Sequence, residues 1–300
     1  MILCCGEALI DMLPRDGAGE ACFAPHAGGA VFNTAVALGR LDASVQFFSG
    51  LSSDLFGTIL QDQLRASGVD SSPAAISDRP TTLAFVKLTD GHASYAFYDE
   101  NTAGRMLTPG DLPDTQADAL FFGGISLVVD PCAAAYEALM LREAPRAVTM
   151  IDPNIRPGFI KDEPVYRARL KRMLGAADII KISDEDLSWI TGNDDATALR
   201  AQTGAAVVLL TRGADGVSVI TSDAAFDVPA VKATVVDTVG AGDTFSAGFL
   251  ADLQAQGLLR KSAIVGVGRD ALTRATAFGA RVAAITVSRA GANPPWASEL

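Results

Sequence analysis

Residues 237–245 read DTVGAGDTF, a sequence that predicts a turn leading into a helix. The three residues before it, Thr-Val-Val at 234–236, are β-branched, as is typical of a strand. After it, Phe245, Phe249 and Leu253 recur at the spacing of one helix face. We therefore expect a strand, a tight turn that contains glycine, and a helix.

The predicted turn has the features of a phosphate site. Gly240 and Gly242 lack Cβ atoms, so backbone N–H groups can approach a bulky anion. A helix N-terminus adds unpaired N–H donors and about +0.5 charge. Asp243 would repel the phosphate, and we interpret it as the base that accepts a proton from an attacking hydroxyl. The alternative is that Asp243 only favours the helix start and the glycines only form a turn.

The spacing of these residues narrows the class of site. No Lys follows the glycines, which excludes a Walker A loop, and Phe245 occupies the third glycine position of a dinucleotide fingerprint. The string resembles the C-terminal signature of the ribokinase-like (PfkB) family of carbohydrate kinases. Residues 28–39, GGAVFNTAVALG, resemble the N-terminal Gly-Gly-x-x-x-Asn-x-Ala signature of that family. The resemblance runs from Ile2 to about Ala292.

The resemblance implies an α/β fold of the ribokinase-like type. This is a three-layer sandwich, with a mostly parallel central sheet flanked by helices, plus a small β-lid. The pattern of the chain agrees, because apolar strand-like runs alternate with helical segments from residue 118 onward. Strands are expected at 1–5, 45–50, 119–124, 147–151, 178–182, 207–210, 217–220 and 225–228. Helices are expected from the glycines at 28–29 to about 41, and at 54–68, 133–142, 161–174 and 261–279.

Two segments are expected to form the lid, at about 12–27 and 81–104. Residues 81–88 and 93–99 alternate as strands around a turn at 89–92, whereas 14–27 predicts a loop or a short, irregular strand pair. The resemblance implies that this lid closes over the sugar and excludes water. The aromatic side chains of the hairpin could contact the ligand or pack the lid onto the main domain. They are Tyr95, Phe97 and Tyr98.

Composition limits the partners and the compartment. The 300 residues are 49% hydrophobic, enough for one kinase domain over 1–300 with a small appendage, and the net charge is −11. An acidic chain argues against nucleic-acid and anionic-membrane partners. Four cysteines without CxxC spacing and only two histidines predict neither a zinc site nor a disulfide framework. We see no signal peptide and no run of about 18 apolar residues, so we expect the cytoplasm.

The resemblance assigns a set of residues to the sugar. Asp11 interrupts an apolar segment; on its own it would be read as a polar residue at a strand edge. Asn33 lies about one turn into the helix that Gly28 and Gly29 open, where exposed N–H groups could bind ligand hydroxyls. Substrate contacts are therefore expected from Asp11, Gly28, Gly29, Asn33, Phe97 and Arg156.

Polar motifs follow three predicted strands, where pockets form in parallel sheets. Asp152-Pro-Asn154-Ile-Arg156 resembles the Asp-x-Asn-x-Arg motif of the family, in which Arg156 could bind phosphate with two donors or form only a surface ion pair. Ser183-Asp-Glu185-Asp186 stands where relatives have Asn-x-x-Glu, which is associated with Mg²⁺ and its waters. The alternative is a solvated acidic helix start. The expected nucleotide contacts are Asn154, Lys181, Ser183, Thr211, Gly213, Gly216 and Gly242.

The resemblance implies ATP-dependent phosphorylation of a primary hydroxyl. Asp243 would be the base, and Gly240, Ala241, Gly242 and Arg156 would stabilise the transferred group. The metal would be Mg²⁺, held through water by Asp186 or Glu185. K⁺ could bind near Asp237 and Val239, and the lid could form a homodimer.

The substrate is expected to be D-fructose. An alternative is 2-keto-3-deoxygluconate, whose carboxylate would need a cation that Lys87 or Arg105 could provide. A different class of alternative is a sugar-sensing protein without catalysis on the same fold.

Overall fold

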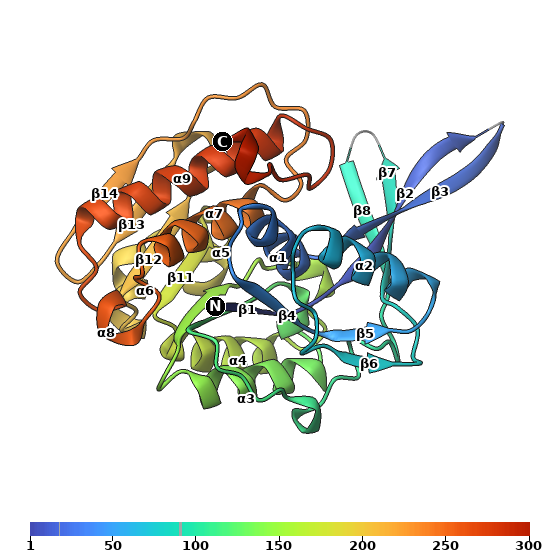
Figure 1. Cartoon of the computed structure of the whole chain (residues 1–300), viewed down its shortest axis with the longest axis horizontal. Coiled ribbons are helices and arrows are strands. Elements are labelled where there is room, and N and C mark those ends of the chain that lie inside the picture. Colours follow the sequence, from blue (N-terminus) through green and yellow to red (C-terminus); the bar gives the residue numbers. More distant parts are fainter. Residues whose placement is uncertain (18, 90–91) are drawn as a thin grey trace.

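The computed structural model describes residues 1–17, 19–89 and 92–300. In this part of the chain a central sheet runs in the order β14-β13-β12-β11-β10-β9-β1-β4 (Figure 1). Its strands pair in parallel except at β12–β13 and β13–β14, which are antiparallel. The bounds are β1 Ile2–Cys5, β4 Val45–Phe48, β9 Ala119–Gly123, β10 Val148–Asp152, β11 Ile179–Ser183, β12 Val207–Thr211, β13 Val217–Ile220 and β14 Ala225–Val228.

Helices cover both faces of this sheet (Figure 1). Successive side chains of a strand point to opposite faces, and in β1 Ile2 and Cys4 join one buried cluster while Leu3 and Cys5 join the other. The first cluster packs under α1 Ala30–Arg40, α2 Leu55–Ala66, α7 Ala241–Ala255, α8 Lys261–Ile264 and α9 Arg269–Val287. The second packs under α3 Cys132–Glu143, α4 Glu163–Ala176, α5 Asp184–Thr191 and α6 Ala196–Thr203. The expected three-layer α/β sandwich is confirmed.

A second sheet lies beside the sandwich, in the order β3-β2-β7-β8 (Figure 1). Its strands are β2 Leu9–Gly17, β3 Glu20–Gly28, β7 Leu83–Thr89 and β8 His92–Tyr98, and a short pair joins β5 Gly50–Ser52 to β6 Ala75–Ser77. The hairpin predicted at 81–99 is present; residues 90–91 of its turn and the side chains of Lys87 and Tyr95 lie outside what the structure describes. Of the two alternatives at 14–27, the strand pair is present and the loop is not, but the pair is longer than expected, because β2 and β3 are paired over nine residues each.

Two predictions near the C-terminus are corrected. Residues 234–236 form no strand but an exposed loop, in which Val235 and Val236 are each 61% exposed. The Val236 amide instead donates to the carbonyl of Val287, at the end of α9. The helix expected at 261–279 is divided into α8 and α9 by a segment that contains two glycines, and α9 continues to Val287.

The described helices include none that is both long and apolar enough to cross a membrane.

Candidate active site

A cavity of about 550 Å³ opens where the sandwich meets the four-stranded sheet. Its walls come from the N-termini of α1 and α7, from the turns after β9 and β10, and from β2 and β8. Pockets of parallel sheets form at the carboxyl ends of their strands, which is where β9 and β10 end. The topology therefore brings both sequence signatures to one site.

Asp243 is a buried carboxyl group in the first turn of α7. Asn33 Nδ2 donates to its Oδ2 at 2.9 Å, and Asn154 Nδ2 lies 3.4 Å from its Oδ1. Burial raises the pKa of Asp243 to about 7, and the hydrogen bond from Asn33 opposes that rise. A carboxyl group with this pKa can accept a proton near neutral pH.

The two glycines of the turn have separate steric reasons. Gly240 caps α7 with φ of 78°, a left-handed conformation, and a Cβ on it would lie 2.6 Å from the Cβ of Ala292. A Cβ on Gly242 would lie 3.0 Å from Lys181 Nζ. Both glycines and Ala241 line the cavity, and because the Ala241 amide donates to the carbonyl of Thr238 at 3.3 Å, the amides of Gly242 and Asp243 are the ones that an anion there could use.

Below this turn lies a buried ion pair. Lys181 Nζ lies 2.9 Å from Asp152 Oδ2, and both residues are at most 5% exposed. Asp152 Oδ1 is buried and has no hydrogen-bond partner among the described residues. Asp186 is also buried, and its Oδ1 accepts the Ile155 amide at 3.1 Å. Burial, with Asp152 nearby, raises the pKa of Asp186 to about 6.

The turn after β10 presents the Asp-x-Asn-x-Arg motif to the cavity. Asn154 has φ of 45°, which an asparagine tolerates better than most residues. Its side chain reaches Asp243, and Arg156 is an exposed residue on the cavity wall. Arg156 Nη1 also donates to the carbonyl of Ile155 at 3.0 Å. The motif thus adds an amide and a guanidinium to the α7 side of the cavity.

The other end of the cavity contains the residues predicted to bind sugar. Asp11 lies on β2, and burial raises its pKa to about 6. A Cβ on Gly28 would lie 2.3 Å from Asp11 Oδ2, so this glycine makes room for the carboxyl group. Gly29, with φ of 109°, begins α1, and Phe97 of β8 packs edge-on against Phe159 at 4.9 Å.

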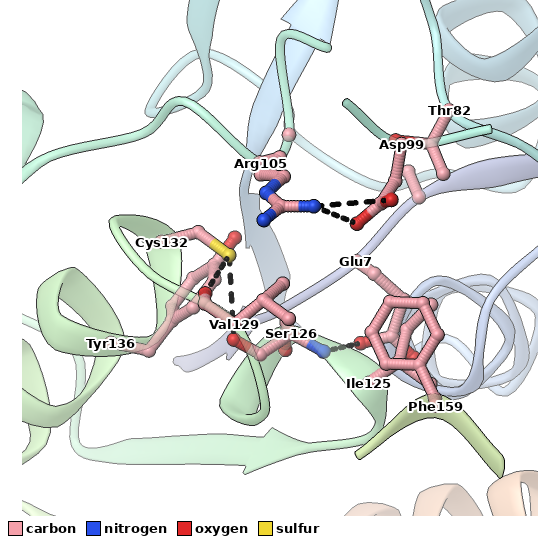
Figure 2. A pocket seen from close by; sticks show the side chains of 12 residues that line it. Glu7, Thr82, Asp99, Arg105, Ile125, Ser126, Val129, Cys132, Tyr136 and Phe159 are labelled. Carbon is pink, nitrogen blue, oxygen red and sulfur yellow. Dashed lines mark hydrogen bonds and ion pairs between the residues drawn. The ribbon is translucent and has the colours of Figure 1, made fainter. Parts of the chain in front are cut away.

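Glu7 is a cavity residue that the sequence analysis missed. Its carboxyl group accepts the Ala30 amide at 2.9 Å. It also accepts the Ser126 amide at 3.3 Å, which Figure 2 shows. It therefore fixes the start of α1 against the turn after β9, and burial raises its pKa. A carboxylate two residues after a buried strand was the available signal, because pockets form at the ends of such strands, as was expected for Asp152.

Several predicted nucleotide residues lie outside the described cavity wall. Thr211 ends β12, and Gly213 and Gly216 follow it; a Cβ on Gly216 would lie 2.4 Å from the carbonyl of Val228, which is a packing reason for that glycine. Ser183 caps α5 by accepting the Asp186 amide, and Glu185 is exposed.

The segment predicted to bind K⁺ is held together by Asp237. Its carboxylate accepts the amide of Val239 at 3.0 Å and the amide of Gly291 at 2.9 Å. Val239 lines the cavity. The loop before α7 is thereby tied to the C-terminal tail.

Comparisons with known proteins agree with this geometry. The chain matches the pfkB family carbohydrate kinases over residues 1–299. It is 57% identical over 278 residues to a fructokinase of Rhizobium leguminosarum bv. trifolii, which covers 91% of this chain and 85% of that protein. It superposes with a TM-score of 0.90 on an ATP-bound fructokinase from Xylella fastidiosa, at 33% identity, covering 97% of this chain and 93% of that one.

A third relative was solved with both a sugar and a nucleotide bound. This is a fructokinase from Vibrio cholerae O395 in fructose, ADP and calcium ion bound form. Its TM-score is 0.83 at 27% identity, and the match covers 97% of this chain and 94% of that one. The chain therefore belongs to the PfkB family of carbohydrate kinases, which makes it a phosphotransferase with an alcohol acceptor.

Proposed function

We propose that this kinase transfers the γ-phosphoryl group of ATP to the 6-hydroxyl of D-fructose. The observation that carries the proposal is Asp243, a buried carboxyl group with a pKa of about 7 at the N-terminus of α7, whose first residues line the cavity. The 57% sequence identity between this chain and the Rhizobium leguminosarum bv. trifolii fructokinase supports fructose as the sugar.

In this proposal each end of the cavity has one task. Asp11, Asn33 and the start of α1 bind the sugar hydroxyls, with Gly28 and Gly29 giving space and Phe97 covering the ring. Asp243 accepts the proton of the attacking hydroxyl. The amides of Ala241, Gly242 and Asp243, together with Arg156 and Asn154, neutralise charge on the transferred group. Phosphoryl transfer depends mainly on such positioning and charge stabilisation.

The residues present fit Mg²⁺ bound through the nucleotide. No group of three or more His, Cys, Asp or Glu side chains in the described structure forms a metal site, and Mg²⁺ commonly takes one or two carboxylates plus phosphates and water. Asp152, whose Oδ1 has no hydrogen-bond partner among the described residues, and the buried Asp186 would supply such carboxylates, whereas Glu185 is exposed. When bound, the ion neutralises phosphate charge. K⁺ near Asp237 and Val239 is the proposed second cation, to be tested by exchanging K⁺ for Na⁺.

A coupled assay of ADP release tests the proposal. Purified protein is given Mg²⁺-ATP with D-fructose, 2-keto-3-deoxygluconate, ribose or a purine nucleoside. We expect the highest kcat/KM with fructose. Turnover only with the keto acid would replace fructose by that substrate, and fructose binding without ADP release would indicate a sugar sensor.

The four-stranded sheet is proposed to act as the lid and to pair two copies of the chain. On the face opposite Phe97, Phe23 and Tyr98 each pack edge-on against Phe85, at 5.0 and 5.5 Å. Phe23 remains 44% and Tyr98 62% exposed. Sedimentation of the wild type and of Phe23→Ser/Tyr98→Ser should show a dimer and a monomer, respectively. A monomeric wild type at micromolar concentration would contradict this.

The four free thiols, of which that of Cys22 is exposed, are consistent with the proposed location in the reducing cytoplasm.

A further inference from the structure

A small side cavity opens next to the sugar end of the main cavity. It measures about 30 Å³, and Glu7, Ile125 and Phe159 line both cavities. Figure 2 shows the side chains around it, among them Thr82, Asp99, Arg105, Ser126 and Tyr136; most of the surface that faces the side cavity is apolar. A space of this size holds about one or two water molecules, or the terminal group of a small ligand.

An ion pair forms the far wall of this side cavity. Arg105 Nη1 lies 3.3 and 3.2 Å from the two carboxylate oxygens of Asp99 (Figure 2). Both side chains are largely buried, at 22% and 12% exposed. The backbone holds Arg105 in place, because its amide donates to Thr102 Oγ1 and its carbonyl accepts the Cys132 amide. The Arg105 guanidinium therefore lies in the cavity wall, where the Asp99 carboxylate neutralises its charge.

Glu7 stands where the two cavities meet. Two backbone amides fix its carboxyl group there, so it cannot turn away from an incoming ligand without losing both hydrogen bonds. A ligand group that enters past Glu7 meets carboxyl groups from Glu7 and Asp99, and a cation that Asp99 has neutralised. Carboxyl oxygens accept hydrogen bonds, so they suit a hydroxyl donor and repel a carboxylate.

We propose that the side cavity is the subsite for the non-reacting end of the sugar, and that the Asp99–Arg105 pair makes it accept a neutral hydroxymethyl group and reject a carboxylate. This inference rests on the proposed function. Fructose and 2-keto-3-deoxygluconate share a 2-keto group and a 6-hydroxyl, and at C1 they differ as hydroxymethyl against carboxylate. The pair would thus decide between the two substrates that the sequence left open.

The test changes the charge of the pair without changing its size. Asp99→Asn leaves the Arg105 cation unmatched, so we expect the ratio of kcat/KM for fructose over the keto acid to fall by about tenfold or more. Asp99→Asn/Arg105→Gln removes both charges and should not gain activity with the acid. Asp227→Asn, which breaks an Asp–Arg pair with Arg212 outside both cavities, is the matched control and should leave the ratio unchanged.

Inhibition of fructose turnover by the keto acid is measured as well, because it reports binding when the acid reacts slowly. A folded Asp99→Asn protein whose ratio and inhibition constant stay within about twofold of wild type would overturn the inference. Should this variant fail to fold, Glu7→Gln must lower the ratio in the same direction, and an unchanged ratio there overturns it equally. If the wild type prefers the acid, both proposals fail. If the wild type turns over another neutral sugar instead, only the identity of the sugar is wrong. The ratio of kcat/KM for that sugar over kcat/KM for the keto acid is then measured in its place.

Discussion

The two ends of the cavity are formed by different parts of the fold. At the α7 end, Asp243, Lys181 and Asp152 are all at most 7% exposed, and Lys181 and Asp152 form an ion pair. Asn33, which is also proposed to bind the sugar, donates to Asp243 there. They come from the central sheet and from helices packed on it. At the other end, Asp11 lies on the four-stranded sheet, which is only partly buried and pairs β2 with β7 over just three residues.

This difference separates chemistry from selection. Charge that develops during phosphoryl transfer is best stabilised by groups that are already fixed in place, and the core fixes them. In the proposed function the sugar is bound partly by side chains of a peripheral sheet, such as Asp11 and Phe97, which can change without disturbing the core. Changes at the α7 end should therefore affect turnover and stability, whereas changes at the sheet should affect sugar affinity.

The largest effect is expected from Asp243→Asn. The amide keeps the shape but cannot accept the proton, so kcat should fall by about 10²–10⁴ with little change in the KM for sugar. Steady-state kinetics measure both constants. A variant with normal turnover would remove Asp243 from the mechanism, and a variant with raised KM and normal kcat would erase the proposed separation between the two ends.

The next largest effect is expected on stability when one of two ion pairs is broken, with the unfolding free energy measured by chemical denaturation. Lys181→Met leaves Asp152 buried without its counterion and should cost about 3–5 kcal/mol of unfolding free energy. Lys261→Met breaks the more exposed pair with Asp178, where Lys261 is 28% exposed, and should cost about 1 kcal/mol or less. Equal losses in the two variants would show that burial at the α7 end is not what fixes its charges.

The pH dependence of kcat/KM tests the base. Only the ionised carboxylate accepts a proton, so activity should be lost as pH falls through the Asp243 pKa of about 7 and reach a plateau above it. About two pH units below the pKa, the loss should be about a hundredfold. Asn33→Ala removes a hydrogen bond that lowers this pKa, so the midpoint should move to higher pH. A profile that is flat between pH 5 and 8 would argue against the assignment.

The smallest effect is expected at the sheet. The folded-state pKa of Asp11, about 6, exceeds the usual value of 3.8, so the stability that Asp11 contributes is present below pH 3.8 and is lost as pH rises through 6. Wild type should therefore lose about 1 kcal/mol relative to Asp11→Asn between pH 5 and 8, after allowance for partial exposure. Thermal unfolding of both proteins measures this. Asp11→Asn should also raise the KM for sugar while leaving kcat within a fewfold of wild type.

Much of this architecture follows from local sequence. The apolar runs predicted most of the central strands, because strands buried on both faces leave a continuous hydrophobic signal. The helix after DTVGAGDTF and the helix after the glycines at 28–29 were predicted from periodicity and turn residues. The prediction of the PfkB family is confirmed over residues 1–299. The roles of the individual site residues stay predictions.

Local patterns were insufficient where stability comes from distant contacts. The β2–β3 hairpin contains Pro14, Pro25 and several polar residues, and only its pairing across nine residues makes it a sheet. Residues 234–236 have the composition of a strand, yet no neighbouring strand pairs with them and they remain exposed. Glu7 had no motif of its own, and its importance appears only when α1 and the turn after β9 meet at its carboxyl group.

The sequence by itself determined most of the elements of the sandwich and the family that they indicate, because periodicity, glycine placement and the two signatures are local properties of the chain. Tertiary structure alone decided the environment of each charge. It buried Asp243 beside Asn33, paired Lys181 with Asp152, and matched Arg105 with Asp99. The physical reason is that desolvation and charge pairing depend on which groups meet in space, and residues far apart in the chain meet only in the folded state.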